Sequence, residues 1–204
     1  MFTGKCPGVG KTTLALALRG VLGEKRVLVF NQDLLASSLP DPLVRAICFR
    51  NELHDRLVQT RAALPEILVI DKNCLTPTVR ENTLSMRRRE MEYTAYVEFS
   101  SPKGDKVLFT TAYNRIRGRL YQSLTLPRDK EMTVINQMIK NYEAPTKEEM
   151  DRSLGKIVID VHLGVADALR CLLTSMCNFN IIDDMPDDAA INKAAAAALA
   201  ENKF

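Results

Sequence analysis

A glycine-rich segment near the start of the chain is the feature that most restricts its fold. It reads Gly-Val-Gly-Lys-Thr-Thr and leads directly into an apolar stretch with helical spacing, residues 12–22. This is the core of a phosphate-binding loop, G-x-x-x-x-G-K-[ST], whose glycines let backbone N–H groups turn toward phosphate oxygens at a helix N-terminus. The motif predicts a nucleotide-binding loop formed by Gly8, Val9, Gly10, Lys11, Thr12 and Thr13.

Two side chains of this loop have expected roles of their own. We expect Lys11 to hold the β- and γ-phosphates and the hydroxyl of Thr12 to bind Mg²⁺. The first glycine of the motif would fall where Lys5 stands, and Gly4 precedes it, which indicates a loop one residue longer than usual. Residues 1–3 supply only part of the buried strand that normally leads into such a loop. Either this strand is very short, or the chain is a fragment from which the first strand has been trimmed.

Apolar segments typical of buried strands alternate with segments of helical spacing along the chain. The strand segments are 25–31, 66–70, 93–100 and 156–161, and the helical ones are 12–22, 43–62, 78–92, 106–121, 128–142 and 164–176. This alternation predicts an α/β P-loop phosphotransferase fold, with a mostly parallel central sheet flanked by helices and a helical lid that carries arginines. We expect one domain over residues 1–182, followed by an acidic, alanine-rich tail over residues 183–204 that forms a peripheral helix or is disordered.

Composition excludes several classes of protein. Hydrophobic residues make up 46% and charged residues 26%, which excludes a disordered, collagen-like or coiled-coil chain. The net charge of +3 is too small to imply a polyanionic partner, but residues 72–128 hold 11 basic against 5 acidic side chains. The five cysteines form no C-x-x-C pair, and no apolar run reaches the length of a membrane span. We therefore expect an intracellular protein, cytoplasmic or nuclear, with no membrane partner.

Two aspartates follow buried strand segments and are candidates for catalysis. Asp33 lies just after the strand that ends at Asn31, and the ends of parallel strands face one crevice. Asp33 is therefore a candidate for the base that accepts the proton of an attacking hydroxyl, with a turn cap as the alternative. Asp71 follows the run Ile-Leu-Val-Ile, as in a Walker B strand whose acid orients Mg²⁺ or its water. Simple termination of the strand is the alternative for Asp71.

Arginines are concentrated in the middle of the chain. Arg115 and Arg119 are four residues apart, so they share one helix face in the expected lid, where they would stabilise charge on a phosphoryl group in transit. Lys72, Arg80 and Arg87 are candidates for contact with an RNA backbone. A solvated charged face is the competing interpretation, and we prefer it for residues 87–89.

The order of these motifs resembles a known family. The segments G-V-G-K-T-T, N-Q-D, V-I-D-K-N, N-R-I-R-G-R, N-Y-E-A-P and K-I-V-I-D-V occur in the order found in the kinase domain of fungal-type tRNA ligases. That domain belongs to the polynucleotide 5′-kinase group of P-loop phosphotransferases. The resemblance extends from about Lys5 to Leu173 and identifies residues 1–182 as a polynucleotide kinase domain.

The resemblance implies transfer of the γ-phosphate of GTP or ATP, with Mg²⁺, to the 5′-OH of a tRNA-like RNA end. It implies that Asp33 is the general base, that Lys11 and Thr12 bind phosphate and metal, that Asp71 is the second acid, and that Arg115 and Arg119 are the paired lid arginines. Asn114 stands where the family usually has an aspartate, and the segment after the lid is shorter, so GTP and ATP both remain open as donors. In the family this kinase lies between a ligase and a cyclic phosphodiesterase domain, so the chain is a lone module or part of a larger ligase polypeptide.

Two other functions share the phosphate-binding loop. A P-loop kinase for a small metabolite or nucleoside would use Lys11, Thr12 and the lid, without needing basic residues outside the nucleotide pocket. A partner-regulated P-loop NTPase would hydrolyse nucleotide without an acceptor hydroxyl, and would depend on a partner or on oligomerisation.

Overall fold

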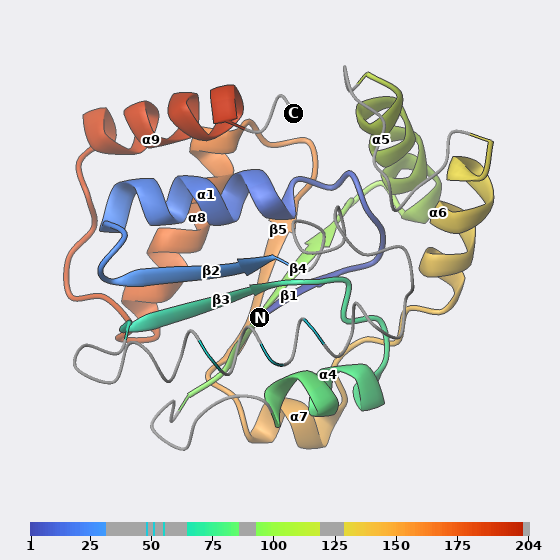
Figure 1. Ribbon diagram of the computed structural model, residues 1–204, viewed down its shortest axis with the longest axis horizontal. Coiled ribbons are helices and arrows are strands. Elements are labelled where there is room, and N and C mark those ends of the chain that lie inside the picture. Colours follow the sequence, from blue (N-terminus) through green and yellow to red (C-terminus); the bar gives the residue numbers. More distant parts are fainter. Residues whose placement is uncertain are drawn as a thin grey trace.

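The computed structural model describes residues 1–31, 65–85, 93–118 and 129–201, together with residues 48, 51 and 55. Within this part of the chain it has the predicted α/β architecture, a parallel sheet with helices packed around it (Figure 1). The strands are β1 (Phe2–Gly4), β2 (Val27–Asn31), β3 (Ile67–Asp71), β4 (Ala95–Ser100) and β5 (Gly155–Asp160).

All pairings between these strands are parallel. β1 pairs with β4 and β4 pairs with β5, while β2 pairs with β3. β1 also lies against β3, so the strands follow one another in space as β2-β3-β1-β4-β5. Because parallel strands share one direction, their carboxyl ends meet at one edge of the sheet. The glycine-rich loop follows the central strand β1 at this edge.

Helices cover both faces of the sheet and its carboxyl edge. α1 (Lys11–Leu22), α8 (Val165–Asn178) and α9 (Asp188–Glu201) form one layer, and α4 (Pro77–Leu84) and α7 (Lys147–Asp151) lie on the opposite side of the strands (Figure 1). α5 (Asp105–Arg117) and α6 (Glu131–Lys140) pack on each other beyond the carboxyl ends of the strands. The predicted helix over residues 43–62 lies almost entirely outside the described residues.

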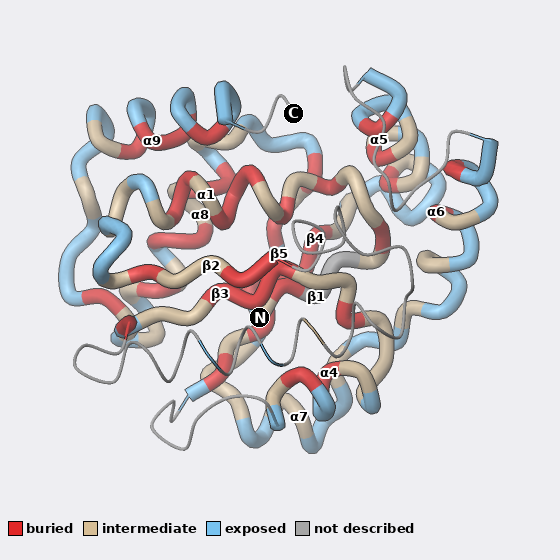
Figure 2. Tube along the Cα trace, viewed as in Figure 1, coloured by how far each residue is buried: buried red, intermediate tan, exposed pale blue. Residues whose placement is uncertain are grey.

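The core lies between the sheet and the layer formed by α1 and α8. Figure 2 shows buried segments along the strands and along the inner sides of these helices, with exposed segments on the outer turns. The rings of Phe2 and Phe99 meet edge to face with centroids 5.8 Å apart, which joins β1 to β4. Leu14 and Leu18 of α1 and Leu169 of α8 are at most 2% exposed. No helix in the described part of the chain is long and apolar enough to cross a membrane.

The segment expected as a separate tail packs on the rest of the fold. Residues 188–201 form α9, which lies along α1 and α8 and buries Ile191, Ala194, Ala195 and Ala198. A Cβ atom on Gly20 would lie 3.4 Å from the Cβ of Ala194, so small residues allow the helices a close approach. Arg170 of α8 bonds the carboxylate of Asp188 at 2.8 Å. Of the two alternatives that the sequence left open for the tail, a helix is the one observed.

One helix was not expected from hydrophobic periodicity. α7 has only five residues, and it begins with a capping box in which the Thr146 hydroxyl accepts the amide of Glu149, while the Glu149 carboxylate accepts the amide of Thr146. The sequence Thr-Lys-Glu-Glu carries this signal, since a threonine three residues before a glutamate is typical of a helix start.

Candidate functional site

The glycine-rich loop has the backbone that its glycines allow. Gly8 and Gly10 have φ angles of 81° and 106°, a region that residues with a Cβ atom rarely adopt. At Gly8 space is short as well, because a Cβ would lie 2.7 Å from the carbonyl oxygen of Ala112 and 2.8 Å from Ile116 of α5. Gly10 is the N-cap of α1, so the N–H groups of the first turn face the loop. The loop and the positive end of α1 therefore form one anion-binding surface.

Lys11 is held against this loop. Its side chain is 8% exposed, and its ammonium group donates a hydrogen bond to the carbonyl oxygen of Cys6 at 3.0 Å. Because of this bond, the Lys11 side chain folds back over the loop that precedes it. The charge is therefore placed beside the backbone that would surround a phosphate group.

Thr12 is joined to the ends of two strands. Its hydroxyl donates to Oδ2 of Asp71 at 2.6 Å, and the amide of Asn31 donates to the same carboxylate oxygen at 2.6 Å. The Asn31 amide also lies 3.1 Å from the Thr12 hydroxyl. Asn31 and Asp71 are direct partners in the β2–β3 register, so strand pairing itself sets the two side chains next to each other. Asn31 is 7% exposed and Asp71 is 4% exposed.

The Thr12–Asp71 pair has the chemistry of a magnesium site. Mg²⁺ prefers oxygen ligands and is usually bound through one or two carboxylates together with phosphate oxygens and water. A hydroxyl and a carboxylate next to a phosphate-binding loop fit this pattern. Within the described residues, no group of three or more histidine, cysteine or acidic side chains is arranged to hold a metal ion. The donor set therefore fits a nucleotide-bound magnesium ion.

Arg115 connects α5 to the loop. Its guanidinium donates to the carbonyl oxygen of Val9 at 3.1 Å and to that of Val161, just after β5, at 2.6 Å. Burial lowers the pKa of Arg115 from its ordinary value, but an arginine remains charged at neutral pH. A Cβ on Gly10 would lie 3.7 Å from Nη1 of Arg115, so this cation lies next to the loop.

Other predicted site residues are placed differently or lie outside the described residues. Asp33, Arg87 and Arg119 belong to the latter group. Lys72 is partly exposed and directly follows Asp71 at the end of β3. Arg80 is fully buried: it forms an ion pair with Glu149 at 2.7 Å and donates to the carbonyl oxygens of Cys74, Glu143 and Ala144.

The prediction that Arg80 contacts RNA is not compatible with this position. A guanidinium with no exposed surface, whose donors point to a carboxylate and to main-chain carbonyl oxygens, has no face left for a phosphate. Its role is to join α4 to α7 and to the segment before α7. The sequence alone does not distinguish a buried arginine from solvent-exposed ones, because burial depends on partners that are distant in the chain.

Asn31 is a site residue that sequence reasoning missed. The sequence predicts a chemical role for Asp33, just after the end of the same strand, because a carboxylate accepts a proton and an amide does not. The sequence signal for Asn31 is its position, because it is the last residue of the apolar strand segment 25–31 and strand ends of a parallel sheet lie near the loop. Cys6 also lies in the loop, and burial raises the pKa of its thiol to about 11, so it remains protonated at neutral pH.

Of the comparisons with known proteins, the one with solved structures bears on the fold. No protein-family model and no curated protein sequence matches the chain. Among solved structures, the chain is similar to a gluconokinase from Sinorhizobium meliloti 1021, with a TM-score of 0.53 and 13% sequence identity. The match covers 98% of this chain and 95% of that chain. At this identity the likeness shows the fold alone: the described part of the chain has an α/β fold similar to that of this neighbour, with a phosphate-binding loop after the first strand.

Proposed function

We propose that this protein is a nucleoside-triphosphate-dependent phosphotransferase whose donor site is the loop of residues 8–13. One observation carries the proposal: the Thr12 hydroxyl lies 2.6 Å from the Asp71 carboxylate, directly after Lys11 and at the N-terminus of α1. Phosphoryl transfer needs positioned donors, a positive charge and a metal site at one place, because charge on the transferring oxygens must be stabilised. The loop, Lys11, Thr12 and Asp71, which could meet these requirements, lie together at the carboxyl edge of the sheet.

Each residue has a distinct task in this proposal. The loop N–H groups and Lys11 would bind the β- and γ-phosphates, and Thr12 and Asp71 would hold Mg²⁺, which would supply positive charge to offset the negative charge of the phosphates. Asn31 would keep the Asp71 carboxylate turned toward Thr12, since it donates to that carboxylate. Arg115 would fix the loop against α5 and add positive charge beside it. Asp33 would accept the proton of the acceptor hydroxyl during in-line attack.

We propose the 5′-OH of an RNA end as acceptor, with GTP or ATP as donor. The order of motifs shared with fungal-type tRNA ligase kinase domains supports this choice, as does the basic surplus between residues 72 and 128. The buried Arg80 contributes nothing to such a surface, but Lys103 and Lys106 are exposed around the start of α5. The chain would act alone or as the kinase module of a larger ligase.

A small polyhydroxy metabolite is the second candidate acceptor. The specific observation in its favour is the likeness to a gluconokinase over nearly the full length of both chains.

The test is phosphate transfer from γ-labelled GTP and ATP, in parallel, to 5′-OH RNA, 5′-OH DNA and gluconate in the presence of Mg²⁺. Label on RNA ends supports the polynucleotide kinase, and label on gluconate alone supports the second candidate. Lys11→Ala should abolish transfer, whereas Thr110→Ala, on the exposed side of α5, should leave it unchanged. Nucleotide hydrolysis with no labelled acceptor would contradict both kinase proposals and favour the partner-regulated NTPase.

A further inference from the structure

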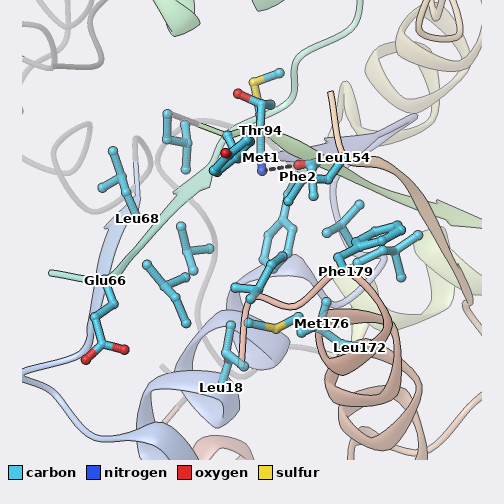
Figure 3. A pocket seen from close by; sticks show the side chains of 18 of the residues that line it. Met1, Phe2, Leu18, Glu66, Leu68, Thr94, Leu154, Leu172, Met176 and Phe179 are labelled. Carbon is cyan, nitrogen blue, oxygen red and sulfur yellow. Dashed lines mark hydrogen bonds between the residues drawn. The ribbon is translucent and has the colours of Figure 1, made fainter. Parts of the chain in front are cut away.

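The two edges of the sheet differ in the kind of substrate that they could hold. At the amino edge lies a cavity of about 870 Å³, lined mostly by apolar side chains such as Leu68, Leu172 and Met176 (Figure 3). Among the described residues that line it, Glu66 carries the one charged side chain, and a carboxylate repels an anion. The cations that could hold an anionic substrate lie instead at the carboxyl edge, beside the phosphate-binding loop.

Lys5 is a cation at this edge that has no task in the proposed donor site. It stands where the phosphate-binding motif has its first glycine, directly after β1. Its ammonium group lies 2.7 Å from the carboxylate of Asp105, at the start of α5, and 5.5 Å from the centre of the Tyr142 ring. The Lys5 side chain is 20% exposed, so solvent still reaches this charge.

Lys5 and Lys11 both lie near Cys6. The carbonyl oxygen of Cys6 accepts the hydrogen bond from the Lys11 ammonium group at 3.0 Å. Burial raises the pKa of the Cys6 thiol to about 11, and the charges of Lys11 and Lys5 both act against this rise. Because Lys11 is the cation that we assign to the transferred phosphate, Lys5 is placed to reach the molecule that receives this phosphate.

Tyr142 holds the Lys5 ammonium group from the side of the sheet. The Tyr142 hydroxyl donates to Oε2 of Glu98 on β4 at 2.8 Å, and Lys156 of β5 bonds the same oxygen at 3.2 Å. Glu98 is 7% exposed, so the sheet gives this carboxylate, and with it the ring, a fixed position. The face of an aromatic ring attracts an ammonium group. Tyr142 therefore orients Lys5 independently of Asp105.

Asp105 is the exchangeable partner of Lys5. Its side chain is 55% exposed, and an ion pair this open to water contributes little to stability, because solvent screens the two charges. An incoming anion can therefore replace the Asp105 carboxylate at low cost. The contact also shows which chemistry the position accepts, because a carboxylate oxygen lies 2.7 Å from the ammonium nitrogen.

We propose that Lys5 is the acceptor-binding cation of the phosphotransferase. It binds an anionic group that the acceptor carries near the hydroxyl to be phosphorylated, in exchange for the carboxylate of Asp105. A 5′-OH RNA end has such a group in its first phosphodiester, and gluconate has one in its carboxylate. The assignment rests on the proposed function and narrows its substrate class to anionic hydroxyl compounds.

The test compares acceptors with and without the anion, for whichever acceptor the wild-type protein labels. RNA with a neutral methylphosphonate as its first linkage, or glucose in place of gluconate, should have an acceptor KM at least about tenfold higher. Lys5→Met should raise the KM of the anionic acceptor by a similar factor and leave the KM of the nucleotide unchanged. The neutral acceptor should not lose further in this variant, because the same contact is already absent. Lys5→Arg should restore the KM of the anionic acceptor.

Asp105→Asn separates an exchangeable partner from a structural ion pair. Without the competing carboxylate, Lys5 is available to the acceptor more of the time, so the acceptor KM should fall about two- to fivefold. A purely structural pair would instead give a higher KM for the nucleotide or a lower unfolding temperature. Lys193→Met, at an exposed position of α9, is the matched control and should leave both KM values unchanged.

Equal acceptor KM values for wild type and Lys5→Met, with transfer intact, would overturn this proposal and leave the proposed function standing. Absence of transfer by the wild-type protein would contradict the proposed function, and binding then decides the role of Lys5. Binding is measured by fluorescence anisotropy of labelled 5′-OH RNA and by calorimetry with gluconate, each with a non-hydrolysable GTP or ATP analogue. Binding about tenfold weaker in Lys5→Met would support the anion site. Equal binding by both proteins, or none by either, would overturn it.

Discussion

The hydroxyl of Thr12 and the carboxylate of Asp71 lie 2.6 Å apart, although 59 positions separate them in the chain. One belongs to the first turn of α1 and the other to the last residue of β3. Parallel strands bring these two points together, because every strand end and the loop after β1 meet at the same edge of the sheet.

Asp71→Asn should impair phosphoryl transfer mainly by weakening metal binding. The amide keeps the shape of the side chain but loses the charge that attracts Mg²⁺, so the concentration of Mg²⁺ giving half-maximal transfer should rise roughly 10- to 100-fold. The measurement is a Mg²⁺ titration of initial rates for the wild-type and Asp71→Asn proteins. Asp151→Asn, on the exposed side of α7, is the control and should leave the titration unchanged. An unchanged titration in the Asp71 variant would remove this residue from the metal site.

Gly8→Ala should destabilise the fold more than Gly23→Ala. Both glycines have a positive φ, of 81° and 96°, so both substitutions carry a similar backbone cost of about 1–2 kcal/mol. A Cβ at position 23 meets nothing within 4 Å, whereas at position 8 it would lie 2.7 Å from Ala112 of α5. The free energy of unfolding, measured in urea, should therefore fall further for the Gly8 variant. Equal losses in the free energy of unfolding would show that α5 moves away from a Cβ at position 8 without a cost in stability.

Arg115→Lys should slow transfer more than Arg117→Lys. Lysine keeps the charge, but one ammonium group does not reproduce the planar fork that reaches Val9 and Val161. We expect the rate of transfer to fall about tenfold or more as the loop loses its connection to α5. Arg117 is exposed and contacts only Tyr113 of its own helix among the described residues, so its replacement should have little effect. The measurement is the initial rate of transfer at saturating nucleotide for the Arg115→Lys and Arg117→Lys variants.

Glu149→Gln should flatten the acid side of the stability profile. Hydrogen bonds from Arg80 lower the pKa of the Glu149 carboxyl below its ordinary value of 4.5. The folded pKa is thus lower than the unfolded one, so the ionised pair stabilises the fold above the unfolded pKa. This contribution is lost as the pH falls through the folded pKa.

The measurement is the free energy of unfolding in urea between pH 7 and pH 3. Glu148→Gln is the matched control, because Glu148 is adjacent, is exposed and forms its ion pair with the exposed Arg152. Wild type and the Glu148 variant should lose stability in parallel on acidification, and the Glu149 variant should lose less. Parallel profiles for all three proteins would show that the Arg80–Glu149 ion pair does not contribute to the pH dependence of stability.

Short-range patterns predicted much of this fold. The glycines, Lys11 and Thr12 specify the loop locally, because a positive φ and a helix start are properties of neighbouring residues. The alternation of apolar strands with helices likewise predicted the parallel sheet, since consecutive parallel strands need a crossover between them.

Partners distant in the chain decided the remainder. Asn31 lies in the candidate site because the β2–β3 register places it opposite Asp71. Arg80 became a buried structural residue because Glu149 and two carbonyl oxygens, more than 60 positions away, surround its guanidinium. The alanine-rich segment packs closely on α1, because Gly20 of α1 has no side chain where it meets Ala194. Local sequence determines which elements form, but which side chains are desolvated depends on tertiary packing, because desolvation is a property of everything that surrounds a group.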